Sequence, residues 1–274
     1  MKRYVALGSS MAAGPGIRPR AAGAPWSAGR SARNYPHLVA ERLSLELVDV
    51  TFSGATTAHV LADRQRGVPP QIAALDGSEA LVTVTVGGND VGYIPLLMVA
   101  SLLGSIARLL PGPLDDPHRR LAAVARHLPL LGGRIDELLD REARDRALDD
   151  VFDSLCAIGR ALRQRAPRAR VFFVDYLTVL PPAGAPAPPL SAADADLGRH
   201  VAATLERLTA EAAAATGCEV VGAAAASRHH HAWSAQPWTV KPVRTGVPLP
   251  GRPAPLHPNG AGMCAVADLV SDRV

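Results

Sequence analysis

Five short apolar runs, separated by longer stretches, constrain the fold of this chain more than any other feature. Each has the length of a buried strand, and the runs are Tyr4–Leu7, Leu45–Val50, Ala80–Val86, Arg170–Val174 and Cys218–Val221. Strands that alternate with helices are typical of a parallel sheet, because a crossover must return the chain before the next strand can run in the same direction. We therefore predict an α/β fold whose five-stranded parallel sheet is covered by helices on both faces.

Helical periodicity is clearest in two of the intervening segments, Asn34–Leu43 and Ala192–Thr216. About 80 residues separate the third predicted strand from the fourth. We predict that residues 91–169 form a helical insertion on the sheet, broken at Pro111–Pro113 and at Gly132-Gly133, and that residues 1–274 form a single domain.

The composition excludes several classes of protein. Hydrophobic residues make up 48% of the chain, which is enough for a substantial core. The net charge is +4, but the arginines are scattered and only 4% of the residues are aromatic, so nucleic-acid binding is not expected. The most apolar stretch, Ile94–Leu110, is interrupted by Pro95, Gly104 and Arg108, and we expect no integral membrane segment.

Cysteine usage and the N-terminus bear on cofactors and location. The three cysteines, Cys156, Cys218 and Cys264, have no metal-binding spacing, and we expect no metal. The His229–His231 run could bind a metal, but consecutive side chains do not share a face, which favours a solvated loop. Residues Met1–Leu7 lack the pattern of a signal peptide, so we expect a cytoplasmic location. The sequence indicates no particular oligomeric state.

Polar residues follow the predicted strands where a ligand would bind. In open parallel sheets this place is the edge formed by the carboxyl ends of the strands. The blocks are Gly8-Ser9-Ser10, Ser53-Gly54-Ala55, Gly87-Gly88-Asn89-Asp90 and, near the C-terminus, His257-Pro258-Asn259. Together they supply a hydroxyl, a tight backbone turn, a carboxamide and an imidazole, which are the groups that acyl transfer requires.

Each residue type fits one role in that chemistry. A serine hydroxyl attacks only when a base removes its proton, and a histidine can do so near neutral pH. Ser10 is thus the candidate nucleophile and His257 the candidate base. The backbone N–H groups of Ser10 and Gly54 and the side-chain amide of Asn89 are candidate donors to an oxyanion.

In this order the four blocks resemble the motifs of the SGNH (GDSL-type) serine hydrolases, a family of esterases and lipases. The resemblance implies a flavodoxin-like, three-layer α/β/α fold and a carboxylic ester as substrate, either a small molecule or a lipid, with no cofactor. It also identifies Ser10, Gly54, Asn89 and His257 as the four residues of the family name.

The sequence departs from the family pattern at two positions. Ser9 stands where the family usually has Asp before the nucleophile, and Ala254 stands where an Asp usually orients the histidine. We predict a Ser-His dyad in which the main-chain carbonyl of Ala254 accepts the Nδ1 proton of His257, since Pro253 and Pro255 stiffen that backbone.

Further residues are candidates for substrate contacts, and alternative functions stay open. Asp90, Ile94, Met98 and Trp238 lie near the blocks in sequence, although Ile94 and Met98 equally fit a core helix and Asp90 equally fits a structural role. The same site would serve an acyltransferase. A degenerate binding protein that keeps the pocket without turnover is the third reading.

Overall fold

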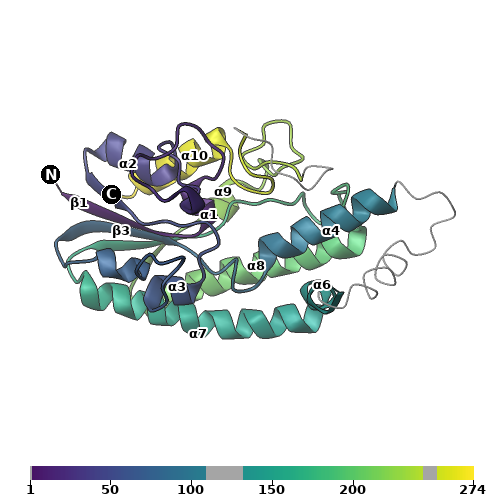
Figure 1. Ribbon diagram of the computed structural model, residues 1–274, viewed down its shortest axis with the longest axis horizontal. Helices are drawn as coiled ribbons and strands as arrows, with labels where there is room; N and C mark the ends of the chain where they lie inside the picture. The colour runs from purple at the N-terminus through teal and green to yellow at the C-terminus, as the bar shows by residue number, and fades with distance from the viewer. Residues whose placement is uncertain (1, 109–131, 243–251) are drawn as a thin grey trace.

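The computed structural model describes residues 2–108, 132–242 and 252–274. Its centre is a five-stranded, wholly parallel sheet in the order β2-β1-β3-β4-β5 (Figure 1). The strands are β1 (Arg3–Gly8), β2 (Glu46–Asp49), β3 (Glu79–Thr85), β4 (Arg170–Val174) and β5 (Glu219–Val221). All five predicted strands are therefore confirmed, and no strand end differs from its prediction by more than one residue.

Helices cover both faces of the sheet, which confirms the predicted three-layer arrangement (Figure 1). The upper side in Figure 1 carries α2 (Tyr35–Leu43) and α10 (Gly260–Ser271), with the short α1 (Ser10–Ala13) and α9 (Ala223–Ala226) near the strand ends. The lower side carries α3 (Thr57–Leu61), α4 (Tyr93–Ala107), α6 (Gly132–Leu139), α7 (Arg141–Arg165) and α8 (Ala192–Ala215).

Alternation along the strands builds two cores. In β1, Val5 and Leu7 belong to the larger cluster with α3, α4, α7 and α8, whereas Tyr4 and Ala6 belong to the smaller cluster with α2 and α10. Successive side chains of a strand point to opposite faces, so each strand contributes to both layers. The segment 91–169 is mostly helical where the structure describes it, in α4, α6 and α7. The predicted break at residues 111–113 lies outside the described residues, and Gly132 and Gly133 are the first two residues of α6.

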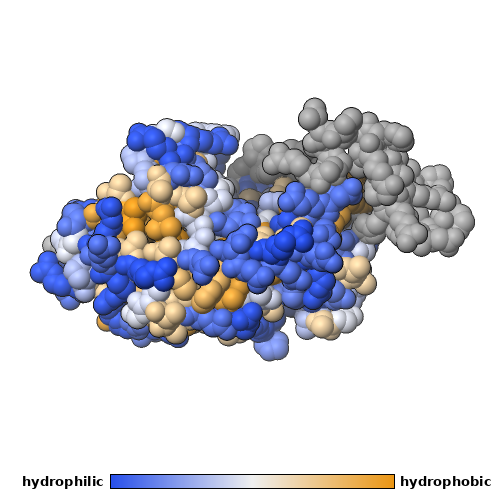
Figure 2. Space-filling view, turned by 90° about the horizontal axis from the view of Figure 1, so that it is seen from below, coloured by the Kyte–Doolittle hydropathy of each residue, from blue (hydrophilic) through white to orange (hydrophobic). Residues whose placement is uncertain are grey.

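The long helix α7 shows how the outer surface is kept polar. Figure 2 views the molecule from the side on which α7 lies, and hydrophilic residues predominate there, with hydrophobic residues in small separate patches. Exposed residues of α7 include oppositely charged pairs one turn apart, such as Arg146 and Glu142. None of the described helices is long and apolar enough to span a membrane.

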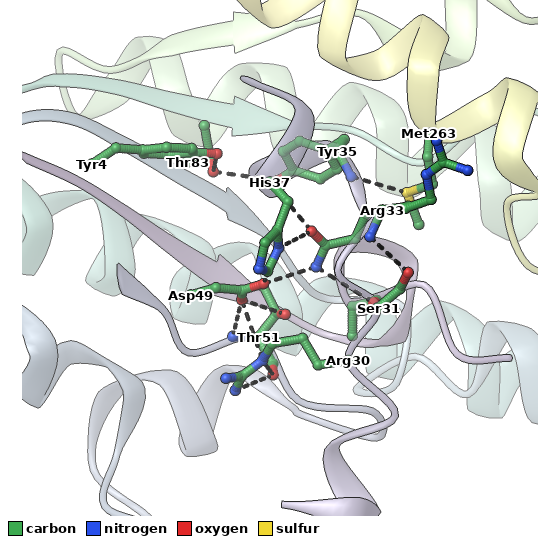
Figure 3. A network of polar contacts seen from close by, with 12 residues as sticks. Tyr4, Arg30, Ser31, Arg33, Tyr35, His37, Asp49, Thr51, Thr83 and Met263 are labelled. Atoms are coloured by element: carbon green, nitrogen blue, oxygen red, sulfur yellow. Dashed lines mark hydrogen bonds and ion pairs between the residues drawn. The ribbon is translucent and has the colours of Figure 1, made fainter. Parts of the chain in front are cut away.

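A two-armed loop connects α1 to α2 and is fixed by a buried carboxylate. Its arms pair at an antiparallel bridge between Arg20 and Ser31, and it contains the short 3-10 helix η1 (Trp26–Ala28). At its end, Asn34 caps α2 and donates 2.8 Å to Asp49. Arg30 lies 3.4 Å from the same carboxylate (Figure 3).

The Asp49 carboxyl is fully enclosed, and its pKa reflects its partners. Burial alone would raise this pKa, but contacts with His37, Arg30, Asn34 and Thr51 outweigh burial and lower it (Figure 3). The charged form is thus stabilised in the folded protein and holds the loop against the end of β2.

Candidate active site

Ser10 and His257 meet at the carboxyl edge of the sheet, although 247 positions separate them in the chain. Ser10 is the first residue of α1, directly after β1, and its Oγ lies 2.8 Å from Nε2 of His257. His257 precedes α10, whose first turn is capped by the Asn259 side chain. Both side chains are mostly buried, at 8% exposure each. The pair predicted from the sequence is brought into hydrogen-bonding contact.

The other ring nitrogen of His257 contacts a different carbonyl from the one predicted. Nδ1 lies 2.7 Å from the main-chain oxygen of Pro255, so the prediction of the Ala254 carbonyl is wrong by one residue. The reason is a tight turn in which the Ala254 carbonyl accepts the backbone N–H of His257 at 3.3 Å. Leu256 completes the turn with a φ of 62°, and the Pro255 carbonyl is left to face the ring.

These surroundings favour the neutral imidazole. Burial lowers the pKa of His257, and the hydrogen bond with the Pro255 carbonyl opposes this effect only in part. With Nδ1–H donated to a carbonyl, Nε2 carries the lone pair that faces the Ser10 hydroxyl. The arrangement can therefore accept a proton from Ser10.

The three candidate oxyanion donors belong to the segments that follow β1, β2 and β3. The Ser10 N–H belongs to the open first turn of α1, and Gly54 has a φ of 80°, a conformation that favours glycine. Neither N–H donates to another described residue. Asn89 donates one amide proton to the Ala55 carbonyl at 2.8 Å, which orients its side chain and leaves the second proton free.

Asp90 ties two of these strand ends together. Its carboxylate accepts from the Thr57 hydroxyl at 2.6 Å and from the Thr57 backbone N–H at 3.0 Å. The bonds join the β3 loop, which carries Asn89, to the start of α3, three residues after Gly54. Burial raises the pKa of Asp90, and the Thr57 bonds oppose that shift. Its described contacts are thus structural, and a contact with substrate stays a prediction.

Tyr176 is a site residue that sequence reasoning missed. Its hydroxyl accepts the backbone N–H of Gly88 at 3.1 Å and lies 3.0 Å from Ser9 Oγ. Ser9, which stands where the family pattern has Asp, is therefore partnered by the Tyr176 hydroxyl. Gly88 is required here, because a Cβ would lie 2.3 Å from the Tyr176 ring. Tyr176 lies two residues after the end of β4. The rule that ligands bind at the carboxyl ends of parallel strands could therefore have predicted it.

The remaining residues predicted to contact substrate are Trp238, Ile94 and Met98. Trp238 supports the histidine segment: its carbonyl accepts the Asn259 N–H at 2.9 Å, and its ring stacks on His230 with centroids 4.1 Å apart. Ile94 is buried in the larger core, as the alternative reading expected, whereas Met98 is 39% exposed on α4. Substrate contacts by these three residues stay predictions.

An apolar cavity of about 430 Å³ lies beyond the end of β4. Tyr93, Tyr176 and residues of α8 line it, but Ser10, Gly54, Asn89 and His257 do not. Tyr176 thus lines the cavity and also contacts the Ser10 loop through Ser9. The cavity also contains Asp175, whose pKa burial raises to about 7. Among the described residues, no group of three His, Cys, Asp or Glu side chains is arranged to hold a metal ion.

Comparison with known proteins identifies the family. The model of the GDSL-like Lipase/Acylhydrolase family matches residues 6–265, which is nearly the whole chain. The chain belongs to this family. As a GDSL-like acylhydrolase it is a carboxylic-ester hydrolase, and the family resemblance inferred from the four blocks is confirmed.

Proteins similar to this GDSL-like hydrolase are named lipases or phospholipases. It is 31% identical to Lipase 2 of Streptomyces coelicolor over 276 residues, which covers 98% of this chain and 84% of that lipase. Similar solved structures are phospholipase A1 from Streptomyces albidoflavus (TM-score 0.75, 22% identity) and the extracellular lipase of Streptomyces rimosus (TM-score 0.74, 23% identity). The phospholipase comparison covers 100% of this chain and 99% of its own, and the rimosus comparison covers 100% of both. At these identities the two structures show the shared fold.

Proposed function

We propose that this hydrolase cleaves carboxylic esters through a Ser10–His257 dyad and a covalent acyl-enzyme. The observation that carries the proposal is the 2.8 Å contact between Ser10 Oγ and His257 Nε2, with Nδ1 fixed by the Pro255 carbonyl. In the first step Ser10 Oγ forms a bond to the ester carbonyl carbon while His257 takes the hydroxyl proton. The imidazolium then gives this proton to the departing alkoxide, and the C–O bond of the ester breaks.

Water completes the cycle by the same route. His257 removes a proton from the water as its oxygen attacks the acyl carbon, and returns that proton to Ser10 as the acid leaves. In both steps the negative carbonyl oxygen is held by Ser10 N–H, Gly54 N–H and the free amide proton of Asn89. Loss of one such donor typically slows an enzyme by about 10²–10³-fold.

A carbonyl can replace the usual carboxylate in this arrangement, but only in part. It fixes the imidazole tautomer, as the 2.7 Å contact with Pro255 supports. It carries no full charge to stabilise the imidazolium, so the dyad is expected to be slower than a triad. The substrates are small-molecule or lipid esters, in keeping with relatives named lipases. The single-domain organisation and the cytoplasmic location stay predictions.

Labelling with a serine-directed fluorophosphonate tests this proposal. We expect stoichiometric labelling of the wild type, none of Ser10→Ala, and labelling of His257→Ala slowed by several orders of magnitude. Ser9→Ala is the matched control, because it removes the neighbouring hydroxyl and should leave Ser10 reactive. Labelling that survives in Ser10→Ala, or that is lost only in Ser9→Ala, would refute the assignment of the nucleophile.

A further inference from the structure

Trp26 is the most exposed large hydrophobic side chain among the described residues, at 83%. It begins η1, at the tip of the two-armed loop between α1 and α2. Neighbouring Gly23 has open space around it, with nothing within 4 Å of where a Cβ would stand. An indole ring left in water is unusual, because burying a side chain of this size is strongly favourable.

The loop that presents Trp26 is an ordered support. Its arms are joined by backbone hydrogen bonds, from Ala21 N–H to Arg30 O at 3.0 Å and from Ala32 N–H to Pro19 O at 2.9 Å. Its base is held by the Asp49 contacts (Figure 3). The position of Trp26 is therefore fixed relative to the sheet.

The same loop lies between the two segments that carry the candidate active site. Two residues after Trp26, the Ala28 carbonyl accepts the Ser53 N–H at 3.0 Å and the Ser53 hydroxyl at 2.8 Å, and Ser53 directly precedes Gly54. At the other arm, the Pro15 carbonyl accepts the Ala254 N–H at 2.9 Å, three residues before His257. The loop that carries Trp26 is thus bonded to both segments of the site.

Positive charge is concentrated on this loop and the start of α2. Residues 9–40 contain four arginines and no Asp or Glu, so their net charge of +4 equals that of the whole chain. Arg30 is held by Thr51 and Asp49, but Arg18, Arg20 and Arg33 are exposed. In the part of the chain that the structure describes, no carboxylate forms an ion pair with these three. Helix α7, where basic residues alternate with acidic ones and form pairs such as Arg141 with Asp145, has no comparable excess.

We propose that Trp26, with Arg18, Arg20 and Arg33, forms a docking surface for an anionic lipid–water interface, which brings the candidate active site to aggregated substrate. The inference deepens the proposed function and rests on it. Trp prefers the headgroup level of a bilayer, where its ring is partly buried and its N–H stays hydrated. Exposed arginines without an ion pair on the same loop are attracted by anionic headgroups.

Binding to vesicles without ester bonds tests the docking surface separately from catalysis. We would measure cosedimentation with vesicles of ether-linked phosphatidylglycerol and with vesicles of ether-linked phosphatidylcholine. The wild type should prefer the anionic vesicles and lose that preference at about 0.5 M NaCl. Trp26→Ala should weaken binding about tenfold, and Arg18→Gln and Arg20→Gln about fivefold each.

Matched controls separate docking from folding and from turnover. Val274→Ala removes another exposed apolar side chain, at 52% exposure, and should bind like the wild type. Trp26→Ala should keep its activity on soluble p-nitrophenyl acetate, because it leaves the Ala28–Ser53 contact in place. If the wild type does not hydrolyse p-nitrophenyl acetate, the proposed function is refuted, and the vesicle-binding result is then judged by itself.

Three results would overturn the docking surface. One is a wild type that binds neither kind of vesicle. Another is Trp26→Ala binding anionic vesicles as tightly as Val274→Ala. The third is a concentration-dependent dimer that disappears in Trp26→Ala, which would identify a second copy of the chain as the partner.

Discussion

Replacing Tyr176 with Phe tests whether its hydroxyl holds two strand ends together. The substitution keeps the ring against Gly88 and removes only the oxygen that accepts Gly88 N–H at 3.1 Å and contacts Ser9 Oγ at 3.0 Å. Each neutral hydrogen bond contributes about 0.5–1.5 kcal/mol, and a buried N–H left without an acceptor costs about 1–3 kcal/mol. We therefore expect the free energy of unfolding to fall by about 2 kcal/mol.

Equilibrium unfolding in urea measures this change as a lower midpoint at an unchanged slope. The matched control is Tyr93→Phe, since Tyr93 is buried and lines the same cavity as the partly buried Tyr176, but its hydroxyl has no hydrogen bond to another described residue. It should change stability by less than about 0.5 kcal/mol. The Tyr176 variant should also hydrolyse esters more slowly, because Gly88 precedes the donor Asn89. Equal stability of the two variants would refute the reasoning.

Two further predictions concern pH. Burial lowers the pKa of His257, and the neutral imidazole is the proposed base. The acid limb of the pH profile of kcat/KM on a p-nitrophenyl ester should therefore have its midpoint below about 6.5, the ordinary pKa of histidine. A midpoint above about 6.5 would contradict the assignment of His257 as the base. For Asp175, burial raises the pKa to about 7, far above the unfolded value of about 3.9, so its contribution to stability is complete below the unfolded value and is lost as pH rises through 7. Asp175→Asn keeps an acceptor for the Ala224 N–H but cannot ionise. Between pH 5 and 8 the free energy of unfolding of the variant, measured by urea unfolding, should therefore fall by on the order of 2 kcal/mol less than that of the wild type. The same pH profile for both proteins would count against the raised pKa.

The sheet was predictable because its signal is local. Runs such as Leu81–Val86 are buried on both faces, and no other arrangement accommodates so many apolar residues between helices. The place of Ser10 followed from the rule that parallel strands have their carboxyl ends at one edge, whereas His257, which follows no strand directly, was assigned from the order of the four blocks. The partner of Nδ1 was predicted one residue away, since the choice between two adjacent carbonyls depends on a turn that Leu256 completes with a positive φ.

The sequence by itself determined the order of strands and helices and the chemical groups at their ends, because hydrophobic periodicity and residue type are properties of short segments. Only the tertiary structure decided which groups touch. Tyr176 bridges Ser9 and Gly88, and the contact of Ala28 with Ser53 joins the loop that carries Trp26 to the segment before Gly54. Such contacts join residues far apart in the chain, and their geometry depends on how the loops of several strands pack against one another.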